Sequence, residues 1–80
     1  MARLLHRMRQ SPKGDWQMSD VEAVCRQHGL RCSPPTGGGG HYKVSHPATR
    51  EILTIPYRRP IKPYYIRELV RFIDRLEHLP

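Results

Sequence analysis

The sequence HYKVSHPATREILTIP, residues 41–56, decides the fold because it holds two strand-like segments close enough to pair. Residues 41–45 alternate between polar and apolar side chains, and residues 51–56 are apolar and rich in β-branched side chains. The intervening residues 46–50 contain the proline and small polar side chains typical of a turn. We therefore expect an antiparallel hairpin.

Alternation along the first of these strands separates its side chains into two faces. Tyr42 and Val44 share one face, whereas His41, Lys43 and Ser45 share the other. The face with Tyr42 and Val44 suits a hydrophobic core. The polar face would be left for a ligand or a partner.

Three further elements are expected before the hairpin. Residues 2–10 resemble a short basic helix. A second helix should begin at Ser19 as N-cap, with Glu22 completing a capping box, and end before Gly29. Residues 30–33 can then form a first strand.

After the hairpin, Pro63 suits the start of a last helix over residues 64–78. Its apolar positions follow the helical period and should cover the sheet: Ile66, Leu69, Val70, Ile73 and Leu76. The order helix, helix, strand, strand, strand, helix predicts an α+β fold, a three-stranded antiparallel sheet with helices on one face. Residues 1–17 would be an N-terminal helical extension, and residues 18–80 the functional domain.

The charge of the chain favours a polyanionic partner. Fourteen Lys and Arg residues face seven Asp and Glu, a formal net charge of +7, and eleven of the fourteen are Arg. The excess is concentrated in residues 1–18 and 40–63. Arg binds phosphate through a planar, bidentate fork, so nucleic acid is the favoured partner, with an acidic protein as the alternative.

Localisation is expected to be cytoplasmic. The chain has no transmembrane run, so we expect no membrane partner, and its first residues are too charged for a signal peptide. Two cysteines are too few for a disulfide framework.

A run of four glycines, residues 37–40, leads directly into His41. Backbone without side chains lets a phosphate chain approach closely, and an imidazole can move protons near neutral pH. Lys43 lies two residues further along the same strand face, so a cation would accompany the proton-transfer group. The alternatives are a flexible glycine loop and an ordinary polar residue at a strand start.

No metal or other cofactor is expected. Cys25, His28 and Cys32 lack the fourth ligand of a structural zinc site, and Cys25 falls on the apolar side of its helix. The carboxylates are too scattered along the chain to hold Mg²⁺. A nuclease of this composition would favour RNA, which carries its own nucleophile in the 2′-hydroxyl.

Two further groups of residues could contact nucleic acid. Arg67, Arg71 and Arg75 recur along the last helix, either as a solvated face paired with neighbouring acids or as a row that follows phosphates. The aromatic residues could stack on bases. Tyr57, beside Arg58, is the best candidate, and most of the others, including Trp16 and Phe72, are expected in or near the core.

In the order and spacing of its motifs, the chain resembles the HicA toxins, small mRNA interferases of type II toxin–antitoxin systems. The matching segments extend over about residues 18–75 and are Gly29-Leu30 at the helix end, Gly39-Gly40-His41 at the turn, His46-Pro47, the strand Ile52-Leu53-Thr54-Ile55-Pro56, and Lys62-Pro63 with Ile66-Arg67 in the last helix. Gly40 stands where the family pattern has a serine, and the N-terminal helix with Trp16 is additional.

The resemblance implies a double-stranded-RNA-binding-like fold and metal-independent endoribonuclease activity on mRNA. It implies that His41 is the catalytic residue and that a HicB-like antitoxin protein is the partner. We expect the RNA-binding residues to be Gly39, Gly40, Lys43, Arg58, Arg59 and Lys62. A non-catalytic RNA-binding module, which the serine-to-glycine departure favours, and a protein-interaction module remain as alternatives.

Overall fold

The computed structural model describes residues 3–37 and 39–78. These residues form a small α+β fold of three helices and a three-stranded antiparallel sheet, as expected. In chain order the elements are α1 (Arg3–Gln10), α2 (Met18–Gln27), β1 (Arg31–Ser33), β2 (His41–Ser45), β3 (Ile52–Pro56) and α3 (Pro63–Glu77). None of the helices in the described ranges is both long and apolar enough to cross a membrane.

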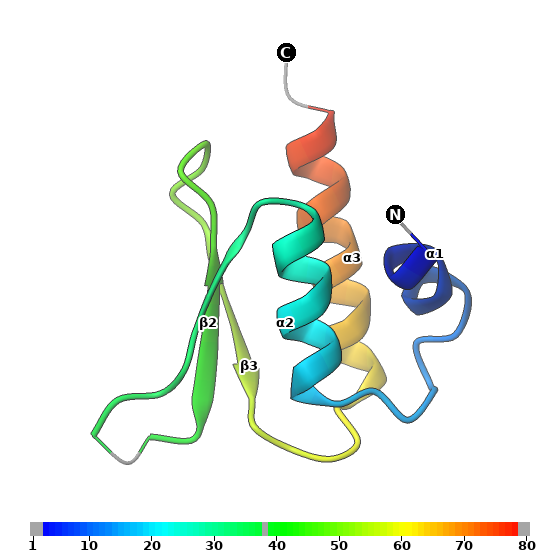
Figure 1. Cartoon of the computed structure of the whole chain (residues 1–80), viewed down its shortest axis with the longest axis horizontal. Coiled ribbons are helices and arrows are strands. Elements are labelled where there is room, and N and C mark those ends of the chain that lie inside the picture. The colour runs from blue at the N-terminus through cyan, green and yellow to red at the C-terminus, as the bar shows by residue number, and fades with distance from the viewer. Residues whose placement is uncertain (1–2, 38, 79–80) are drawn as a thin grey trace.

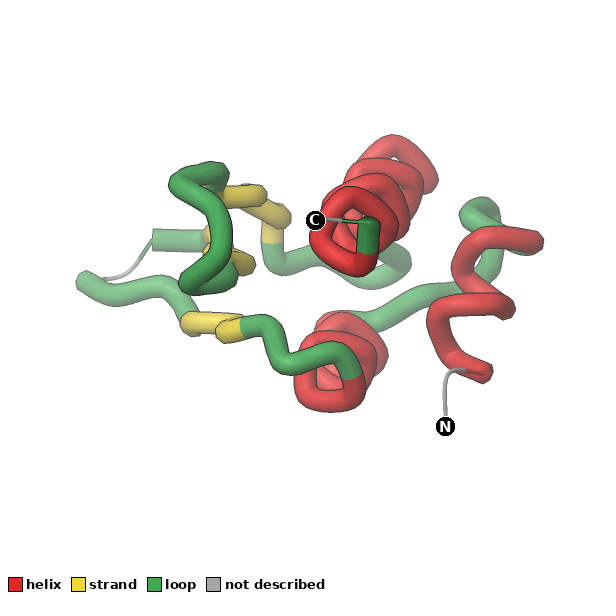
Figure 2. The backbone as a smooth tube through the Cα atoms, turned by 90° about the horizontal axis from the view of Figure 1, so that it is seen from above, coloured by secondary structure: helices red, strands yellow, loops and turns green. Residues whose placement is uncertain are grey.

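The elements stack in three layers (Figure 1, Figure 2). The sheet forms one outer layer, α2 and α3 form the middle layer, and α1 lies against them on the far side. Because all three helices lie on the same side of the sheet, its other face is open. The expected arrangement, with helices on one face only, is confirmed.

The hairpin forms as expected, with only the first residue of its second strand differing. Strand order is β1-β2-β3, and His41 lies opposite Pro56 while Lys43 lies opposite Thr54. Residues paired across a sheet share a face, so these four side chains lie on the open face. The backbone N–H of Tyr57 donates to the carbonyl of Gly40 at 2.7 Å and extends the pairing past the strand ends.

A single hydrophobic core fills the space between the layers. Val44 and Ile55 are fully buried on the inner face of the sheet, as their alternation predicts. Four of the five expected apolar positions of α3 are buried and Leu76 is half-buried. The helix begins at Pro63 and ends one residue earlier than expected.

The start of α2 differs from the prediction. Ser19 is exposed and lies inside the helix, and the N-cap is Gln17. The side chain of Asp20, three residues after the N-cap, accepts a hydrogen bond from the Gln17 backbone N–H at 2.9 Å. Starting the helix two residues earlier places Met18 in the core, where it is 4% exposed, and this burial outweighs the better N-cap propensity of serine.

The end of α2 is formed by Gly29, as expected. Gly29 adopts a left-handed φ of 73°, and the N–H of Leu30 donates back to the carbonyl of Cys25 at 2.8 Å. This is the Schellman arrangement, in which a glycine satisfies the last carbonyls of a helix. The turn also places Leu30 in the core and directs the chain into β1.

The N-terminal segment shares the core of the other elements. Leu5, Met8 and Trp16 are buried in the same cluster as the sheet and helix residues. The carbonyl of Trp16 accepts a hydrogen bond from the N–H of Ile61 at 2.8 Å, and its indole Nε1–H donates to the carbonyl of Ser11 at 2.7 Å. Residues 3–17 are therefore packed against the domain rather than attached to it as a free extension.

Candidate nucleic-acid interface

An open groove of about 390 Å³ brings together most of the residues expected to act on RNA. It lies at the start of β2, beside the connector between β3 and α3. Its walls are Gly40, His41, Pro56, Tyr57, Arg58, Lys62 and Tyr65. The imidazole of His41 is exposed and shares the groove with one guanidinium and one ammonium group. We call this hollow the histidine groove.

The backbone explains how these residues meet. Residues of the glycine run lead into β2, so His41 is its first residue, and antiparallel pairing places it opposite Pro56, the last residue of β3. The chain then leaves β3 through Tyr57 and Arg58 and returns at Lys62 to start α3. Side chains 15 or more positions apart in the sequence are thus gathered at one end of the sheet.

Lys43 lies on the open sheet face, outside the histidine groove. It is exposed and shares that face with His41, two residues earlier on the same strand, as the sequence predicted. Its cross-strand neighbours are Ser33 on β1 and Thr54 on β3. A cation flanked by two small hydroxyl side chains makes this part of the open face polar and positively charged, whereas the 60% exposed Ile52 adds an apolar side chain further along β3.

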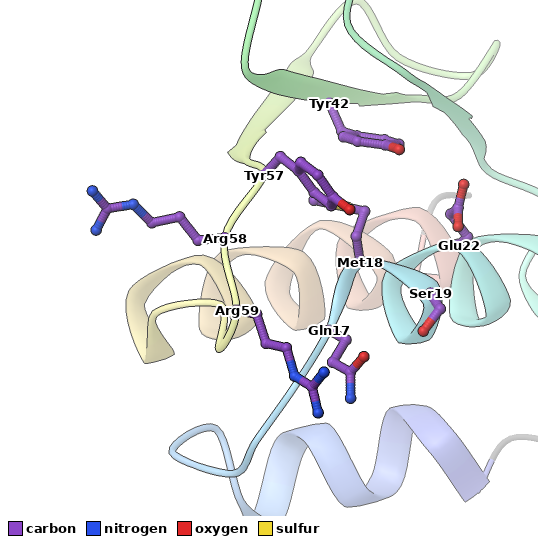
Figure 3. Close-up of a pocket in the computed structure, with 8 residues that line it drawn as sticks. All are labelled: Gln17, Met18, Ser19, Glu22, Tyr42, Tyr57, Arg58 and Arg59. Carbon is purple, nitrogen blue, oxygen red and sulfur yellow. The ribbon is translucent and has the colours of Figure 1, made fainter.

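Arg59 lies apart from Arg58, although the two are adjacent in the chain. Its guanidinium is 3.9 Å from the carboxylate of Asp15, in the loop that joins α1 and α2. Both arginines are exposed and border a second hollow near the start of α2 (Figure 3). An ion pair this long between exposed groups contributes little to stability, so Arg59 keeps most of its capacity to bind an anion.

The three glycines of the run before β2 that the structure describes differ in their surroundings. Gly37 has a left-handed φ of 62°, which favours glycine, whereas the N–H of Gly39 donates to the carbonyl of Thr36 at 3.2 Å and closes a turn. A Cβ added at Gly40 would meet no atom within 4 Å. The fold therefore has room for a side chain at Gly40, so glycine is not required there by packing.

Only part of the aromatic set is available for stacking. Trp16 and Phe72 are in the core, 6% and 3% exposed. Tyr57, the favoured candidate, is 66% exposed, and its ring centroid lies 5.8 Å from that of Tyr42. Tyr64 is also exposed, but its ring packs edge-on against Tyr65.

The arginine row of α3 is engaged partly through long-range ion pairs. Arg71 contacts Glu68 within the helix at 2.8 Å, as helical spacing predicts, but Arg75 contacts Glu51 of the hairpin at 2.9 Å. Asp74 binds Arg9 of α1. For Arg71 and Arg75, these contacts favour the interpretation as a solvated face paired with acidic side chains.

Cys25, His28 and Cys32 make contacts within the fold. The two thiols are close enough for Cys32 to raise the pKa of the buried Cys25 thiol through a hydrogen bond, with burial acting in the same direction. The Nδ1 atom of His28 lies 2.7 Å from a Glu77 carboxylate oxygen, which ties α2 to α3. Within residues 3–37 and 39–78, no three His, Cys, Asp or Glu side chains group closely enough to hold a metal ion.

Sequence reasoning missed several residues that border these hollows. Pro56 and Tyr65 line the histidine groove, and Glu22 and Tyr42 line the second hollow. Glu22 was assigned to a helix cap and Tyr42 to the core. Cross-strand register could have indicated Pro56, since it follows from pairing β3 with β2. The placement of Glu22 and Tyr42 depends on how α2 approaches the sheet, and that of Tyr65 depends on how α3 does.

Comparisons with protein-family models, with curated proteins and with solved structures return no match for this chain. The features of the molecule that bear on its function are therefore the histidine groove, the second hollow and the charge of the surfaces around them.

Proposed function

We propose that this chain is a metal-independent endoribonuclease that cleaves mRNA, with His41 as the acid/base. The observation that carries the proposal is the histidine groove, where an exposed imidazole shares an open hollow with Arg58, Lys62 and the ring of Tyr57. These are the groups that transesterification of RNA needs: a proton acceptor, cations for the phosphate and a surface for a base.

The reaction follows from the chemistry of RNA. His41 takes the proton of the 2′-hydroxyl, and the resulting oxygen attacks the adjacent phosphorus. The bond to the 5′-oxygen breaks, and that oxygen leaves with a proton supplied by the imidazolium or by water. Arg58 and Lys62 stabilise the negative charge that builds on the phosphate oxygens. The products are a 2′,3′-cyclic phosphate and a 5′-hydroxyl.

The other predicted residues have binding roles in this proposal. Lys43 extends the positive surface along the open face of the sheet, and Gly39 and Gly40 let the RNA backbone approach closely. Arg59 would bind a phosphate on the far side of Tyr57 from the imidazole. Together these contacts orient a single strand across the end of the sheet.

The biological role we propose is that of a toxin of a type II toxin–antitoxin system, built on a double-stranded-RNA-binding-like fold. The resemblance to HicA toxins supports it through the order of motifs, and the α+β architecture is consistent with it. The neutralising partner would be a HicB-like antitoxin protein that covers the basic surface. Growth arrest on expression, relieved by a co-expressed antitoxin, would test this role.

A non-catalytic RNA-binding module is the alternative, favoured by one observation. Gly40 supplies no hydroxyl beside His41, where the HicA pattern has a serine. Such a module would bind RNA in a salt-dependent way without breaking it. His41→Ala would then change RNA affinity only slightly.

The test is cleavage of a labelled RNA in EDTA by the whole chain and by His41→Ala. We expect the parent chain to produce fragments ending in 2′,3′-cyclic phosphate, and His41→Ala to lose at least about 100-fold in rate. An RNA with a single 2′-deoxy substitution at the cleaved position should resist cleavage there. Cleavage of that bond would show that the 2′-oxygen is not the nucleophile.

His6→Ala is the matched control, since His6 is also exposed but lies on α1, in the layer farthest from the sheet. It should cleave at the rate of the parent chain. Equal activity in His41→Ala would contradict the assignment of the acid/base, and RNA binding without cleavage by the parent chain would favour the alternative.

A further inference from the structure

A second hollow of about 470 Å³ adjoins the histidine groove (Figure 3). It lies between the first turns of α2 and the end of the hairpin, and its residues are Gln17, Met18, Ser19, Glu22, Tyr42, Tyr57, Arg58 and Arg59. Tyr57 and Arg58 line both hollows. Its volume lies within the range of small-ligand sites, about 300–1,000 Å³, and a nucleobase is smaller than most of their ligands. We call it the tyrosine pocket.

Two tyrosine rings line this pocket on the side of the hairpin, in the upper half of Figure 3. Tyr42 and Tyr57 have centroids 5.8 Å apart and planes inclined by 47°, so they are not stacked face to face. Tyr57 is 66% exposed, so much of its side chain is accessible to a ligand. An exposed aromatic face beside arginines is the usual platform for an unpaired base.

Glu22 brings a carboxylate to the same pocket. Within the described residues, it makes no side-chain hydrogen bond and no ion pair, although eleven arginines make the chain strongly basic. In Figure 3 the Tyr42 hydroxyl extends toward the side of the pocket occupied by Glu22. Partial desolvation, together with the negative charge of Glu22, raises the pKa of Tyr42, which is consistent with that proximity.

We propose that the tyrosine pocket binds a guanine base of the RNA strand, stacked on Tyr57 and hydrogen-bonded to Glu22. The proposal rests on the proposed function in so far as the chain binds RNA. A carboxylate repels phosphate, so its partner in bound RNA is the donor edge of a base. Guanine carries two adjacent donors, N1–H and the 2-amino group, which match the two oxygens of one carboxylate.

The other bases fit this carboxylate less well. Adenine and cytosine each carry one amino donor next to a ring-nitrogen acceptor, and uracil carries its single N–H between two carbonyl oxygens. In each case a Glu22 oxygen would face an acceptor or remain unpaired, which costs free energy away from water. Glu22 therefore makes the pocket selective for guanine.

The location of the pocket indicates which nucleotide it would bind. His41 and Tyr42 are consecutive in β2, and their side chains point to opposite faces of the sheet. The imidazole therefore lines one hollow and the phenol ring the other, with Tyr57 between them. A strand with its scissile phosphate at His41 would place a base of an immediately neighbouring nucleotide in the tyrosine pocket.

The experiment measures binding of His41→Ala to short single-stranded RNAs that differ only in one base, by fluorescence anisotropy. We use this variant so that affinity is measured on intact RNA. The guanine-containing RNA should bind about 5- to 150-fold more tightly than its adenine counterpart, the range for a bidentate base contact. Inosine, which lacks the 2-amino group, should fall between them.

Glu22→Gln, added to His41→Ala, should abolish this preference, because an amide offers one acceptor and one donor where guanine needs two acceptors. Glu68→Gln is the matched control. Glu68 is a half-buried helix carboxylate paired with Arg71 rather than placed in the pocket, so its variant should keep the preference. Tyr57→Ala should weaken binding of every RNA, whereas Tyr57→Phe should retain stacking.

The outcomes separate this proposal from the catalytic one. A guanine preference that depends on Glu22, in a chain that cleaves nothing, would support the pocket and overturn the nuclease. Cleavage of RNA with no preference for guanine in binding, or with a preference that persists in Glu22→Gln, would overturn only the proposed guanine site. Absence of any RNA binding would overturn both.

Discussion

Replacing Met8 by alanine tests whether α1 is an integral part of the folded domain. Met8 is fully buried, and its side chain belongs to the cluster that includes the sheet. Removing a buried methionine down to Cβ typically costs about 2–5 kcal/mol, depending on how far the site can collapse. Because α1 is a short terminal helix that can shift toward α3, we expect a value near the lower end, about 2–3 kcal/mol.

The expected change in melting temperature follows from the size of the chain. An unfolding entropy of roughly 2.1 cal/mol/K per residue gives about 0.17 kcal/mol/K for 80 residues. A loss of 2–3 kcal/mol then corresponds to a decrease of about 12–18 °C. A domain of this length has a total stability of about 4–12 kcal/mol, so the variant should still fold at low temperature.

Thermal unfolding followed by far-ultraviolet circular dichroism measures this change. Arg9→Ala is the control on the same helix, because its exposed ion pair with Asp74 should contribute less than about 1 kcal/mol. A decrease of less than about 3 °C in Met8→Ala, or an early separate transition, would refute the reasoning. It would mean that α1 unfolds independently of the sheet and the other helices.

Three further predictions follow from the backbone and the thiols. Gly29→Ala should lower the free energy of unfolding by about 1 kcal/mol, because its φ of 73° is left-handed, although an added Cβ would meet no atom. An unchanged midpoint in chemical denaturation would contradict this. Gly40→Ser should keep the melting temperature within about 3 °C, since the site has room for a side chain. It should increase the cleavage rate, since the hydroxyl can bind phosphate, and slower cleavage would exclude that role for the hydroxyl. Iodoacetamide at pH 8 should label Cys32 before Cys25, because their hydrogen bond lowers the pKa of Cys32 and burial protects Cys25. Equal labelling of the two thiols in peptide mass spectra would contradict this.

The sheet and the last helix could be predicted from the sequence because their signals are local. The strand over residues 41–45 and the two faces of that strand depend on alternation alone, and the bounds of α3 depend on the helical period and on Pro63. Gly29 was predicted as the end of α2 because few other residues adopt its backbone conformation. Each of these features is set by neighbours within a few positions.

The start of α2 and the packing of α1 could not be predicted in the same way. Ser19 is the better N-cap by propensity, but burial of Met18 moves the helix start to Gln17. The packing of Met8 and Trp16 depends on a surface formed by α2 and α3, which exists only in the folded chain. Both features are determined by the burial of side chains against elements that are distant in the sequence.

The candidate site was predicted only in part. His41, Gly40, Arg58 and Lys62 meet in one groove, as their charges and closeness in sequence suggested. Arg59 was grouped with Arg58, but the connector turns it toward Asp15. The tyrosine pocket could not be found from the sequence, since it requires α2 and the hairpin to be placed next to each other.

The third layer formed by α1 has a consequence for how this chain can diversify. Because α1 packs on α2 and α3, the core is completed on the helix side of the sheet. The open face of the sheet is therefore not needed to complete it. Side chains there, such as Lys43 and Thr54, contribute little to folding and can be exchanged at small energetic cost. Mutational tolerance on that surface should thus be limited by the molecules it recognises, so homologues could acquire new targets without losing their architecture.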